Sequence, residues 1–376
     1  MRAMIVVTHL LGTGHLARAL TLGRAFAEAG HAVRIVSGGR PAPQLDASGL
    51  ELVQLPPLQS DDTDFARLLD DNGAVAGPET LDTRRRQLCE ALARFAPDIL
   101  ITELFPFGRR SLAGEFLALL DAAKALPRLP VILASLRDIL APPSSPAKAA
   151  RTEAQVTRYY DAVLVHSDPR LTRLEQSWPV GAALAPRLRY TGYVAPPPPA
   201  PHPQALGTGE ILVSAGGGAV GGPLFAAAIA AARLLPGRSW RLLVGGGGDL
   251  AALRADAPRN LTVEPARPDF RQMLTGAAAS VSLCGYNTAL DLLQTGVPAV
   301  LVPFDAGREV EQGLRADSLA SLPGIRVLRS AELIPAALAQ AVADVIAAGR
   351  RPVPDAGFDG AARSVALACA MAEARA

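Results

Sequence analysis

The sequence predicts an α/β protein made of two doubly wound domains that face a central cleft. In both halves of the chain, short apolar runs alternate with longer amphipathic stretches, a pattern typical of parallel sheets covered by helices. Residues 195–203 read APPPPAPHP, and consecutive prolines favour a stiff, extended linker. We therefore expect a first domain at 1–194, a linker at 195–209 and a second domain at 210–376. Ligands should bind in the cleft, at the carboxyl ends of the strands.

Composition excludes several classes of protein. Of the 376 residues, 49% are hydrophobic, which is too many for a disordered chain. The 37 basic and 35 acidic residues leave a net charge of +2 without a long basic block, so we expect no nucleic-acid partner. The lysines are Lys124 and Lys148 alone, which excludes a Walker A loop and a lysine Schiff base in the second half.

Cysteine usage and the start of the chain bear on location. Cys89, Cys284 and Cys369 are far apart and odd in number, whereas disulfide frameworks and zinc sites use clustered pairs. The start, MRAMIVVTHLLGTGH, lacks a small-residue cleavage site and a span of about 20 apolar residues. We therefore expect a cytoplasmic protein without a signal peptide. Peripheral contact with the inner face of a membrane stays open.

The first half contains five apolar runs that are short enough for strands, separated by patterns of helical period. Strands and helices that alternate in this way form βαβ units, and hence a parallel sheet. The predicted strands are Ala3–Thr8, Ala32–Val36, Ile99–Thr102, Val131–Ala134 and Ala162–Val165. The predicted helices include Leu16–Ala29, Leu81–Phe95 and Leu112–Ala125.

The second half repeats this organisation without repeating the sequence. Its predicted strands are Ile211–Ser214, Arg241–Val244, Leu261–Val263, Ala279–Leu283 and Val300–Val302. Its predicted helices include Pro223–Leu235, Thr288–Gln294, Glu309–Leu319 and Ala331–Ala348. A last helix, Phe358–Arg375, is rich in small apolar residues, which suits packing against the face of a domain.

The first candidate site is the loop of Gly12, Thr13, Gly14 and His15, which follows the first predicted strand and opens a helix. The glycines let a ligand approach the backbone closely, and the helix N-terminus behind them favours negative charge. A histidine there is placed for a general base, since its ordinary pKa lies near neutral pH. The alternative is that His15 caps the helix or lies at its surface. His166, at the end of another predicted strand, is a weaker candidate.

The second candidate site is the glycine-rich stretch 214–222, which follows a predicted strand and opens a helix. Its backbone N–H groups can cradle a phosphate at the helix N-terminus. It also contains G-x-G-x-x-G, a dinucleotide fingerprint that wants an acidic residue after the next strand, where Asp249 follows a run of four glycines. A flexible glycine turn is the structural alternative. The candidate binding residues are Ser214, Gly216, Gly217 and Gly218.

The third candidate site begins at Gly285, where a turn leads into a predicted helix. We expect Asn287 and Thr288 at the N-cap, where they can hold backbone N–H groups or a phosphate. The Asp291 carboxylate can accept both hydroxyls of a ribose, or it can merely stabilise the helix dipole by roughly 0.3–1 kcal/mol. The next helix starts with polar side chains that can bind sugar hydroxyls or form an ordinary acidic first turn. These are Glu309, Glu311 and Gln312.

Together these stretches resemble the GT-B glycosyltransferases, and among them family 28, typified by the N-acetylglucosaminyltransferase of peptidoglycan synthesis. The fold implied is a pair of Rossmann-like domains. The resemblance spans the whole chain and is best over 211–316. There, GYNTALD at 285–291, GVP at 296–298 and VPF at 302–304 match the donor signature of the family.

The resemblance implies roles for the residues of the second half. Asp291 would bind the nucleotide ribose, and Gln312, beside Glu311, would bind the sugar. The loop Ser214–Gly218 would bind the diphosphate. The segment 266–270, with Arg267 and Phe270, would frame the uracil.

In the first half, the loop from Gly12 to His15 resembles the family's Gly-Thr-Gly-Gly-His loop with one glycine fewer, which implies that His15 is the catalytic base. Glu103, at the end of a predicted strand, is the second candidate. The segments 102–109 and 135–138 resemble a poorly characterised branch of predicted glycosyltransferases. The acceptor is therefore not implied, and both lipid-linked and small-molecule acceptors stay open.

The implied reaction is an inverting displacement that uses a UDP-sugar as donor and needs no metal or further cofactor. A base removes the proton of the acceptor hydroxyl, which attacks the anomeric carbon, while helix dipoles and backbone N–H groups stabilise the leaving UDP. We expect no metal site, because we find no His, Cys, Asp or Glu cluster with metal-ligand spacing. The acidic pairs Asp61–Asp62 and Asp70–Asp71 lie in a segment expected to be rich in loops.

Three other classes of protein share some of these features. A nucleotide-sugar epimerase would bind the same donor but needs two opposed acid–base groups. A nicotinamide or flavin oxidoreductase would use the glycines of 216–221. A binding module that has lost catalysis is the third. Release of free UDP from a UDP-sugar would indicate a transferase, and an epimerised sugar would indicate the epimerase. Absorbance of a bound cofactor would indicate the oxidoreductase.

Overall fold

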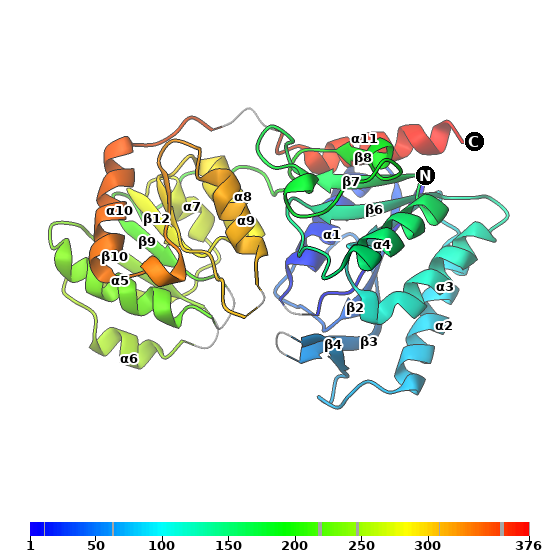
Figure 1. The fold of residues 1–376 in the computed structure, drawn as a ribbon, viewed down its shortest axis with the longest axis horizontal. Helices are drawn as coiled ribbons and strands as arrows, with labels where there is room; N and C mark the ends of the chain where they lie inside the picture. The colour runs from blue at the N-terminus through cyan, green and yellow to red at the C-terminus, as the bar shows by residue number, and fades with distance from the viewer. Residues whose placement is uncertain are drawn as a thin grey trace. The chain divides into compact units, whose positions relative to one another are not determined.

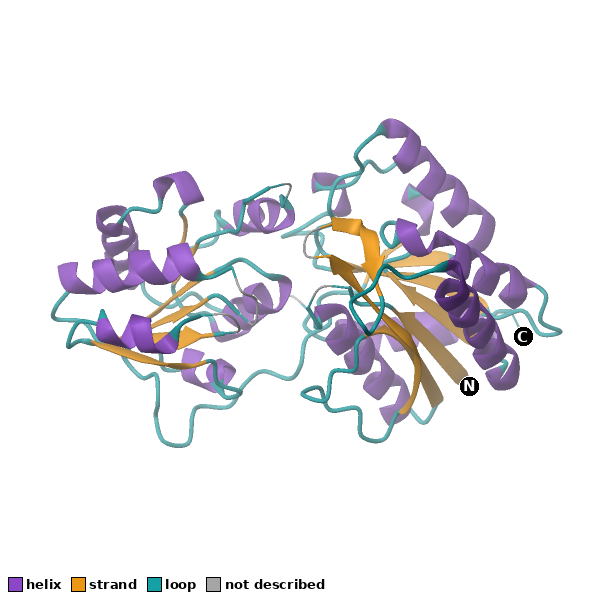
Figure 2. Cartoon of the chain, turned by 90° about the horizontal axis from the view of Figure 1, so that it is seen from below, coloured by secondary structure: helices purple, strands orange, loops and turns teal. Residues whose placement is uncertain are grey.

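The computed structural model describes residues 1–10, 12–61, 64–216, 220–245, 248–307, 309–353 and 357–375, with the backbone alone at 64–66. The chain forms two compact units (Figure 1). The first combines Met1–Pro196 with Gly357–Ala376, and the second is Pro197–Ala356. In each unit, helices lie on both sides of a sheet, which confirms the predicted doubly wound α/β class (Figure 2). None of the helices in the described ranges is long and apolar enough to cross a membrane.

The first unit is built on an eight-stranded sheet in the order β4-β3-β2-β1-β5-β6-β7-β8. Its strand pairs are parallel except for β3 with β4. The strand order reverses between β1 and β5, and ligands bind at such reversals in doubly wound sheets. The strands are β1 (Arg2–Val7), β2 (Ala32–Gly39), β3 (Glu51–Asp61), β4 (Asp64–Leu69), β5 (Ile99–Glu103), β6 (Val131–Arg137), β7 (Ala162–His166) and β8 (Leu188–Tyr190).

Helices cover both faces of this sheet because successive residues of a buried strand point to opposite faces. In β1, Met4 and Val6 belong to one core cluster, while Ile5 and Val7 belong to another. Helices of the first cluster are α2 (Pro78–Phe95), α3 (Ala113–Lys124) and α4 (Pro146–Tyr159). Helices of the second are α1 (Gly14–Glu28) and α11 (Gly360–Glu373).

A buried ion pair joins α2 to α3. Arg84 is fully buried and Glu115 is 5% exposed, and the two guanidinium–carboxylate hydrogen bonds measure 2.7 and 2.9 Å. Arg84 also donates to the backbone oxygen of Gly38 at 2.8 Å and to that of Pro56. These partners compensate for the removal of both charges from water.

The second unit is built on a six-stranded parallel sheet in the order β11-β10-β9-β12-β13-β14. The order reverses between β9 and β12, so the loops after these strands flank a second binding position. The strands are β9 (Ile211–Ser214), β10 (Trp240–Val244), β11 (Leu261–Pro265), β12 (Ala279–Ser282), β13 (Ala299–Leu301) and β14 (Ile325–Val327).

Two groups of helices cover this second sheet (Figure 1). One group packs into the apolar core of the unit, where Ile211, Val213 and Val281 supply the strand side chains. Its members are α5 (Gly222–Leu234), α6 (Leu250–Ala255) and α10 (Pro335–Ala348). The other group follows β11, β12 and β13 and carries most of the donor-site candidates: α7 (Phe270–Leu274), α8 (Tyr286–Thr295) and α9 (Glu311–Leu319).

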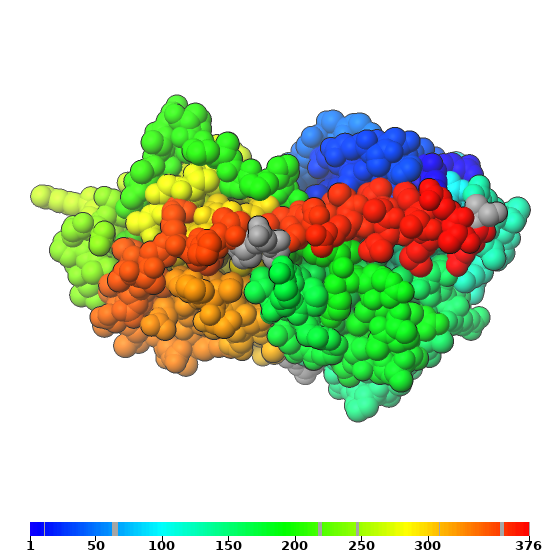
Figure 3. Space-filling model, turned by 90° about the horizontal axis from the view of Figure 1, so that it is seen from above, coloured from blue at the N-terminus to red at the C-terminus, as the bar shows by residue number. Residues whose placement is uncertain are grey.

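The C-terminal helix α11 belongs to the first unit, whereas the sequence assigns it to a second domain at 210–376. Val365 and Ala368 of α11 share a core cluster with Leu16 of α1. Figure 3 shows this segment, in red, lying along the first unit. The small apolar residues of α11 favour packing on the face of a domain, but they do not identify the domain. The packing of α11 against α1, far away in the sequence, places it in the first unit.

Candidate active site

His15 and Glu103, the two candidate catalytic residues, lie at the carboxyl ends of β1 and β5, the two strands between which the first sheet reverses its order. From β1 the chain passes Gly12, whose φ of +66° favours glycine, and enters α1, where His15 lies in the first turn. Glu103 is the last residue of β5. Because β1 and β5 are hydrogen-bonded neighbours, the sheet brings these two side chains together.

His15 and Glu103 form a hydrogen-bonded pair. Nδ1 of His15 lies 2.9 Å from Oε1 of Glu103, and the side chains are 12% and 1% exposed. Arg18, also buried, donates from Nη2 to the same carboxylate oxygen. Ser135 of β6 donates to Oε2 at 2.6 Å. The carboxylate is therefore buried and fully engaged, while the histidine retains some access to solvent.

Burial and charge fix the protonation of this pair. Burial lowers the pKa of His15 to about 3, although the hydrogen bond to Glu103 acts in the opposite direction. Burial favours the protonated form of Glu103, but the charge of Arg18 and the hydrogen bond from His15 outweigh it and hold the pKa of the carboxyl well below its usual range. Glu103 is thus an anion at neutral pH. Arg18 Nη2 also lies 3.2 Å from Nδ1, but the contact of Nδ1 with the carboxylate is shorter, at 2.9 Å. Since an anionic carboxylate has no proton to donate, this contact places the proton of His15 on Nδ1 and leaves Nε2 as an acceptor.

A pocket of about 370 Å³ adjoins the same loop of the first unit. Gly12 and Thr13, which precede His15, belong to its lining. His9, at the end of β1, also lines it and is 5% exposed, and burial lowers its pKa. The rest of the lining mixes polar side chains such as Arg40, Gln59 and Asp61 with apolar ones such as Leu58 and Leu69.

In the second unit, the glycine-rich candidate follows β9. Ser214 ends this strand, and its Oγ accepts a hydrogen bond of 3.1 Å from the backbone N–H of Gly216. Gly216 has a φ of +71°, which favours glycine at this turn. Gly217 and Gly218, the other two candidates of this loop, lie outside the described residues.

The third candidate loop follows β12, the neighbour of β9 across the reversal. Helix α8 begins at Tyr286 with Gly285 as its N-cap, so Asn287 and Thr288 lie in the first turn and not at the N-cap that the sequence predicts for them. Asn and Thr favour N-caps, but the strand ends early enough for the helix to start at the glycine. The N-cap, Gly285, makes no side-chain cap of α8. The N–H groups in the first turn of a helix lack partners within the helix and favour an anion.

Asp291 lies in the second turn of α8 with 14% of its side chain exposed. Arg271 of α7 donates to its Oδ1 at 2.6 Å and to Gln294 Oε1 at 2.7 Å. Burial raises the pKa of Asp291 to about 6, although Arg271 opposes this shift. A ribose bound here would share the carboxylate with Arg271.

Gln312 joins the two loops that follow β12 and β13. Its Oε1 accepts hydrogen bonds from the backbone N–H groups of Cys284 at 3.0 Å and Phe304 at 3.1 Å. Arg315, one turn further along α9, donates to the backbone oxygen of Cys284 at 3.1 Å. The carboxamide oxygen of Gln312 is thus already engaged, which leaves its NH₂ group as the part that can contact a sugar.

The start of α9 carries the two acidic candidates. The Glu309 carboxylate accepts a hydrogen bond of 2.7 Å from the backbone N–H of Glu311 and so caps the helix. Glu309 therefore fits the alternative reading of an ordinary acidic first turn. Glu311 is the first residue of α9 and is partly exposed.

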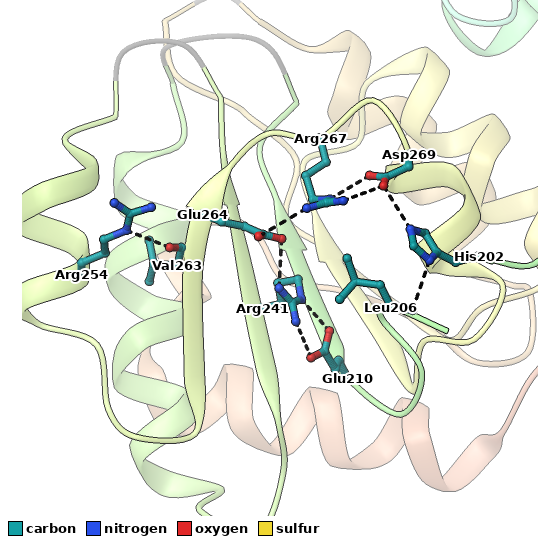
Figure 4. A network of polar contacts seen from close by, with 9 residues as sticks. All are labelled: His202, Leu206, Glu210, Arg241, Arg254, Val263, Glu264, Arg267 and Asp269. Atoms are coloured by element: carbon teal, nitrogen blue, oxygen red, sulfur yellow. Dashed lines mark hydrogen bonds and ion pairs between the residues drawn. The ribbon is translucent and has the colours of Figure 1, made fainter. Parts of the chain in front are cut away.

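Arg267 and Phe270 lie between β11 and α7, where Phe270 begins the helix. Arg267 forms a bidentate ion pair with Asp269, with hydrogen bonds of 2.8 and 2.7 Å (Figure 4). Asp269 also contacts His202 Nε2 at 3.1 Å. His202 lies in the predicted linker, and its side chain is 6% exposed, so this part of the linker is fixed to the loop of Arg267.

The sequence predicts no metal site, and it does not single out three of the arginines described above. Among the described residues, no group of three or more His, Cys, Asp or Glu is placed to hold a metal ion. The triplet Asp62-Thr63-Asp64 has the Asp-x-Asp form, but its side chains lie outside the described part of the chain. Arg18 is not predicted from the sequence, although its position three residues after His15 on one helix is a usable signal. Arg271 and Arg315 are not predicted either.

Two family models match the chain. A glycosyl transferase 4-like domain matches residues 13–186, which include His15 and Glu103. A glycosyltransferase family 28 C-terminal domain matches residues 230–357, which include Asp291 and Gln312. No match was found among curated proteins.

Solved glycosyltransferase structures share the fold over nearly the whole chain. CalG4, the calicheamicin glycosyltransferase, aligns with a TM-score of 0.63 at 20% identity and covers 99% of this chain and 95% of its own. MurG from Acinetobacter baumannii aligns with a TM-score of 0.61 at 16% identity and covers 99% of this chain and 98% of its own. VinC, solved in complex with dTDP, aligns with a TM-score of 0.61 at 15% identity and covers 100% of both chains. The chain therefore carries two glycosyltransferase domains and has the fold of the GT-B glycosyltransferases.

Proposed function

We propose that this chain transfers a sugar from a UDP-sugar to a hydroxyl group of an acceptor, with inversion at the anomeric carbon and without a metal ion or further cofactor. The family 28 C-terminal domain over 230–357 supports a nucleotide-sugar donor. Because VinC was solved with dTDP, the identity of the base is part of the test below.

The pairing of His15 with Glu103 carries the proposal. A neutral hydroxyl is a weak nucleophile and needs a positioned base. Nε2 of His15 is an unprotonated acceptor, and Glu103, behind the ring, compensates the charge that forms when Nε2 takes a proton. Both oxygens of Glu103 already accept hydrogen bonds from His15, Arg18 and Ser135, so the carboxylate has less room for a further proton. We therefore assign Glu103 to orienting His15 and not to the role of base.

In the proposed reaction, the acceptor oxygen attacks the anomeric carbon while its proton passes to His15 Nε2. The bond between that carbon and the phosphate oxygen breaks, and the electron pair leaves with UDP. Attack from the side opposite the leaving group inverts the configuration. The first turn of α8, with Gly285, Asn287 and Thr288, is assigned to the leaving diphosphate.

We assign the acceptor to the pocket beside the His15 loop. The pocket lies in the first unit and includes Gly12 and Thr13, the residues that lead to the base. Its lining offers hydrogen-bonding groups from His9 and Gln59 next to apolar surface from Leu58. This mixture suits an acceptor with polar groups along one side.

The test is incubation of the full chain with UDP-sugars and dTDP-sugars, each with a panel of hydroxylated acceptors and with EDTA present. NMR is expected to show release of the free nucleotide and a product of inverted anomeric configuration. Retained configuration, or activity that returns only when magnesium or manganese is added, would contradict the corresponding part of the proposal. An epimerised sugar nucleotide without released nucleotide would favour the epimerase.

Replacing Asp291 by alanine is expected to weaken binding of a UDP-sugar by about 1.5–3 kcal/mol, the range for a hydrogen bond to a charged group. Because the pKa of Asp291 is raised to about 6, the carboxylate is lost as pH falls through 6. The affinity of the unmodified chain should therefore drop below about pH 6, and that of the Asp291→Ala variant should not. Isothermal titration calorimetry measures both effects.

A UDP-sugar is the suitable probe, because a terminal phosphate such as that of UDP itself titrates near pH 6. Asp344→Ala is the matched control, since Asp344 pairs with Gln340 on α10, away from α8. It should bind the donor as the unmodified chain does. Equal affinity of Asp291→Ala and Asp344→Ala would remove Asp291 from the donor site.

A further inference from the structure

Behind His15 and Glu103, three more side chains continue a hydrogen-bonded chain into the first unit. Ser135 Oγ lies 2.6 Å from Glu103 Oε2 and 3.0 Å from His166 Nε2. His166 Nδ1 in turn lies 2.8 Å from Thr191 Oγ1. Ser135, His166 and Thr191 are all fully buried. They come from β6, from β7 and from the residue after β8, which are successive neighbours in the sheet.

The charge of Glu103 sets the direction of the hydrogen bonds nearest to it. Glu103 is an anion and can only accept, so the single hydroxyl proton of Ser135 goes to Glu103 Oε2. The oxygen of Ser135 must then accept from His166, which places a proton on His166 Nε2. Burial lowers the pKa of His166 to about 3, so its Nδ1 carries no second proton and can only accept. Thr191 Oγ1, with one proton, lies between this Nδ1 at 2.8 Å and the backbone oxygen of Gly192 at 2.9 Å. The hydrogen bonds of His166 to Ser135 and of Ser135 to Glu103 therefore both point toward the carboxylate.

This arrangement acts on the orientation of the carboxylate. His15 and Arg18 both donate to Oε1 of Glu103, while Ser135 donates to Oε2. Without Ser135, one buried carboxylate oxygen would lose its donor, and the Arg18 guanidinium could draw the carboxylate away from His15. The His15 ring would then be free to place its proton on either nitrogen, and only one of the two tautomers leaves Nε2 as a base.

We propose that Ser135 and His166 are positioning residues for catalysis, because they fix the Glu103 carboxylate and thereby hold His15 in the tautomer that presents Nε2 to the acceptor. The inference rests on the proposed role of His15 as the base. A buried serine need not have such a role. Ser37 of β2, in the same sheet, is equally buried, and its hydroxyl has no hydrogen-bond partner among the described residues.

The first readout needs no substrate. The chain contains five histidines, so selective ¹⁵N-histidine labelling and long-range ¹⁵N–¹H spectra resolve each tautomer. His15 is expected with its proton on Nδ1 and His166 with its proton on Nε2. In Ser135→Ala, a population of His15 protonated on Nε2 should appear. In Ser37→Ala, the matched control, the His15 signals should stay as in the unmodified chain.

The second readout is turnover of the nucleotide sugar found by the screen above. Ser135→Ala should lower kcat by about tenfold or more, the effect of losing one hydrogen bond to a charged group, and should leave donor affinity unchanged. His166→Gln keeps an N–H donor toward Ser135 and should retain more activity than His166→Leu, which removes it. This pair of variants carries the test if Ser135→Ala does not fold.

The outcomes separate this inference from the proposed function. If Ser135→Ala matches Ser37→Ala in both the His15 tautomer and kcat, the positioning role is wrong. Equal tautomers and equal kcat in His166→Gln and His166→Leu would overturn it as well. If the tautomers respond as expected but no nucleotide sugar is turned over, the proposed function fails and the hydrogen-bonded chain stands.

Discussion

Replacing His15 by alanine is expected to lower kcat by about 10²–10⁴-fold, the usual contribution of a positioned base, while the affinity for the UDP-sugar stays close to that of the unmodified chain. His15 belongs to the first unit, whereas the residues assigned to the donor belong to the second. Loss of the imidazole removes the proton acceptor and leaves the donor site intact. Steady-state kinetics give kcat, and calorimetry gives the donor affinity.

His31→Ala is the matched control for this experiment. His31 precedes β2, at the amino end of the strands, and contacts the N-terminal amine at 3.3 Å and Cys369 at 3.2 Å. It should leave kcat unchanged. Near-normal kcat in His15→Ala would exclude His15 as the base. Loss of donor affinity in that variant would instead place His15 in the donor site.

The pH dependence of kcat provides an independent check on the same residue. An ordinary histidine titrates near 6.5, but burial lowers the pKa of His15 to about 3. The imidazole therefore stays neutral and able to accept a proton as pH falls through 6.5. At saturating donor, where titration of Asp291 does not limit binding, kcat should show no acid limb near pH 6.5. An acid limb at that pH that disappears in His15→Ala would contradict the buried, paired state of the base.

Replacing Arg84 by leucine is expected to lower the free energy of unfolding of the first unit by about 3–5 kcal/mol, because Glu115 would remain buried without its cation. The chain contains two tryptophans. Trp178 is buried in the first unit and Trp240 in the second, so in a Trp240→Phe background the fluorescence of Trp178 follows the first unit alone. Urea unfolding in that background measures the loss.

Arg85→Leu is the matched control, because it changes the neighbouring residue of the same helix. The ion pair of Arg85 with Asp82 is exposed, with side chains 51% and 62% accessible, and such pairs contribute about 0–1 kcal/mol. The double variant with Arg84→Leu and Glu115→Leu should recover much of the lost stability, since it removes the unpaired charge. If Arg84→Leu unfolds at the same urea concentration as Arg85→Leu, the buried pair does not stabilise the unit.

The buried strands could be predicted from the sequence because a strand that is covered on both faces is a continuous apolar run. Ile211–Ser214 is predicted with the bounds that the structure has, and Ala162–Val165 differs from β7 by one residue. Strands β3 and β4, of which β4 forms one edge of the first sheet, were not predicted as strands. Most residues of β3 are partly or fully exposed, and its two prolines further weaken the strand pattern.

Helix α4 was missed for a related reason. Its sequence, PAKAARTEAQVTRY, is mostly polar, and the helix buries Thr152, Val156 and Tyr159 alone. A helix with so few buried side chains carries little periodic signal. Ser145, which caps it, and the proline at its first position are the usable cues that remain in the sequence.

Individual residues of the candidate site could be predicted from the sequence, but the hydrogen bonds between them could not. A glycine loop after the first strand is enough to single out His15, and a polar residue at a strand end is enough to single out Glu103. Their hydrogen bond depends on β1 lying next to β5, which is a property of the strand order and not of either segment. Arg18, on the helix that follows β1, depends on the same adjacency. Ser135 depends on the pairing of β5 with β6, which places it opposite Glu103.

The return of α11 to the first unit has a consequence for synthesis of the chain. Domains fold in order as they leave the ribosome, but here the second unit can complete its core before the first. Until residues 360–373 have emerged, α1 lacks the helix that packs against it, and the apolar side chains of Leu16 and Ile5 lack part of their cover. Because α1 carries His15, a nascent chain or a fragment that ends before α11 would hold the proposed base on a poorly supported helix. The placement of the proposed base is thus tied to the synthesis of residues 360–373.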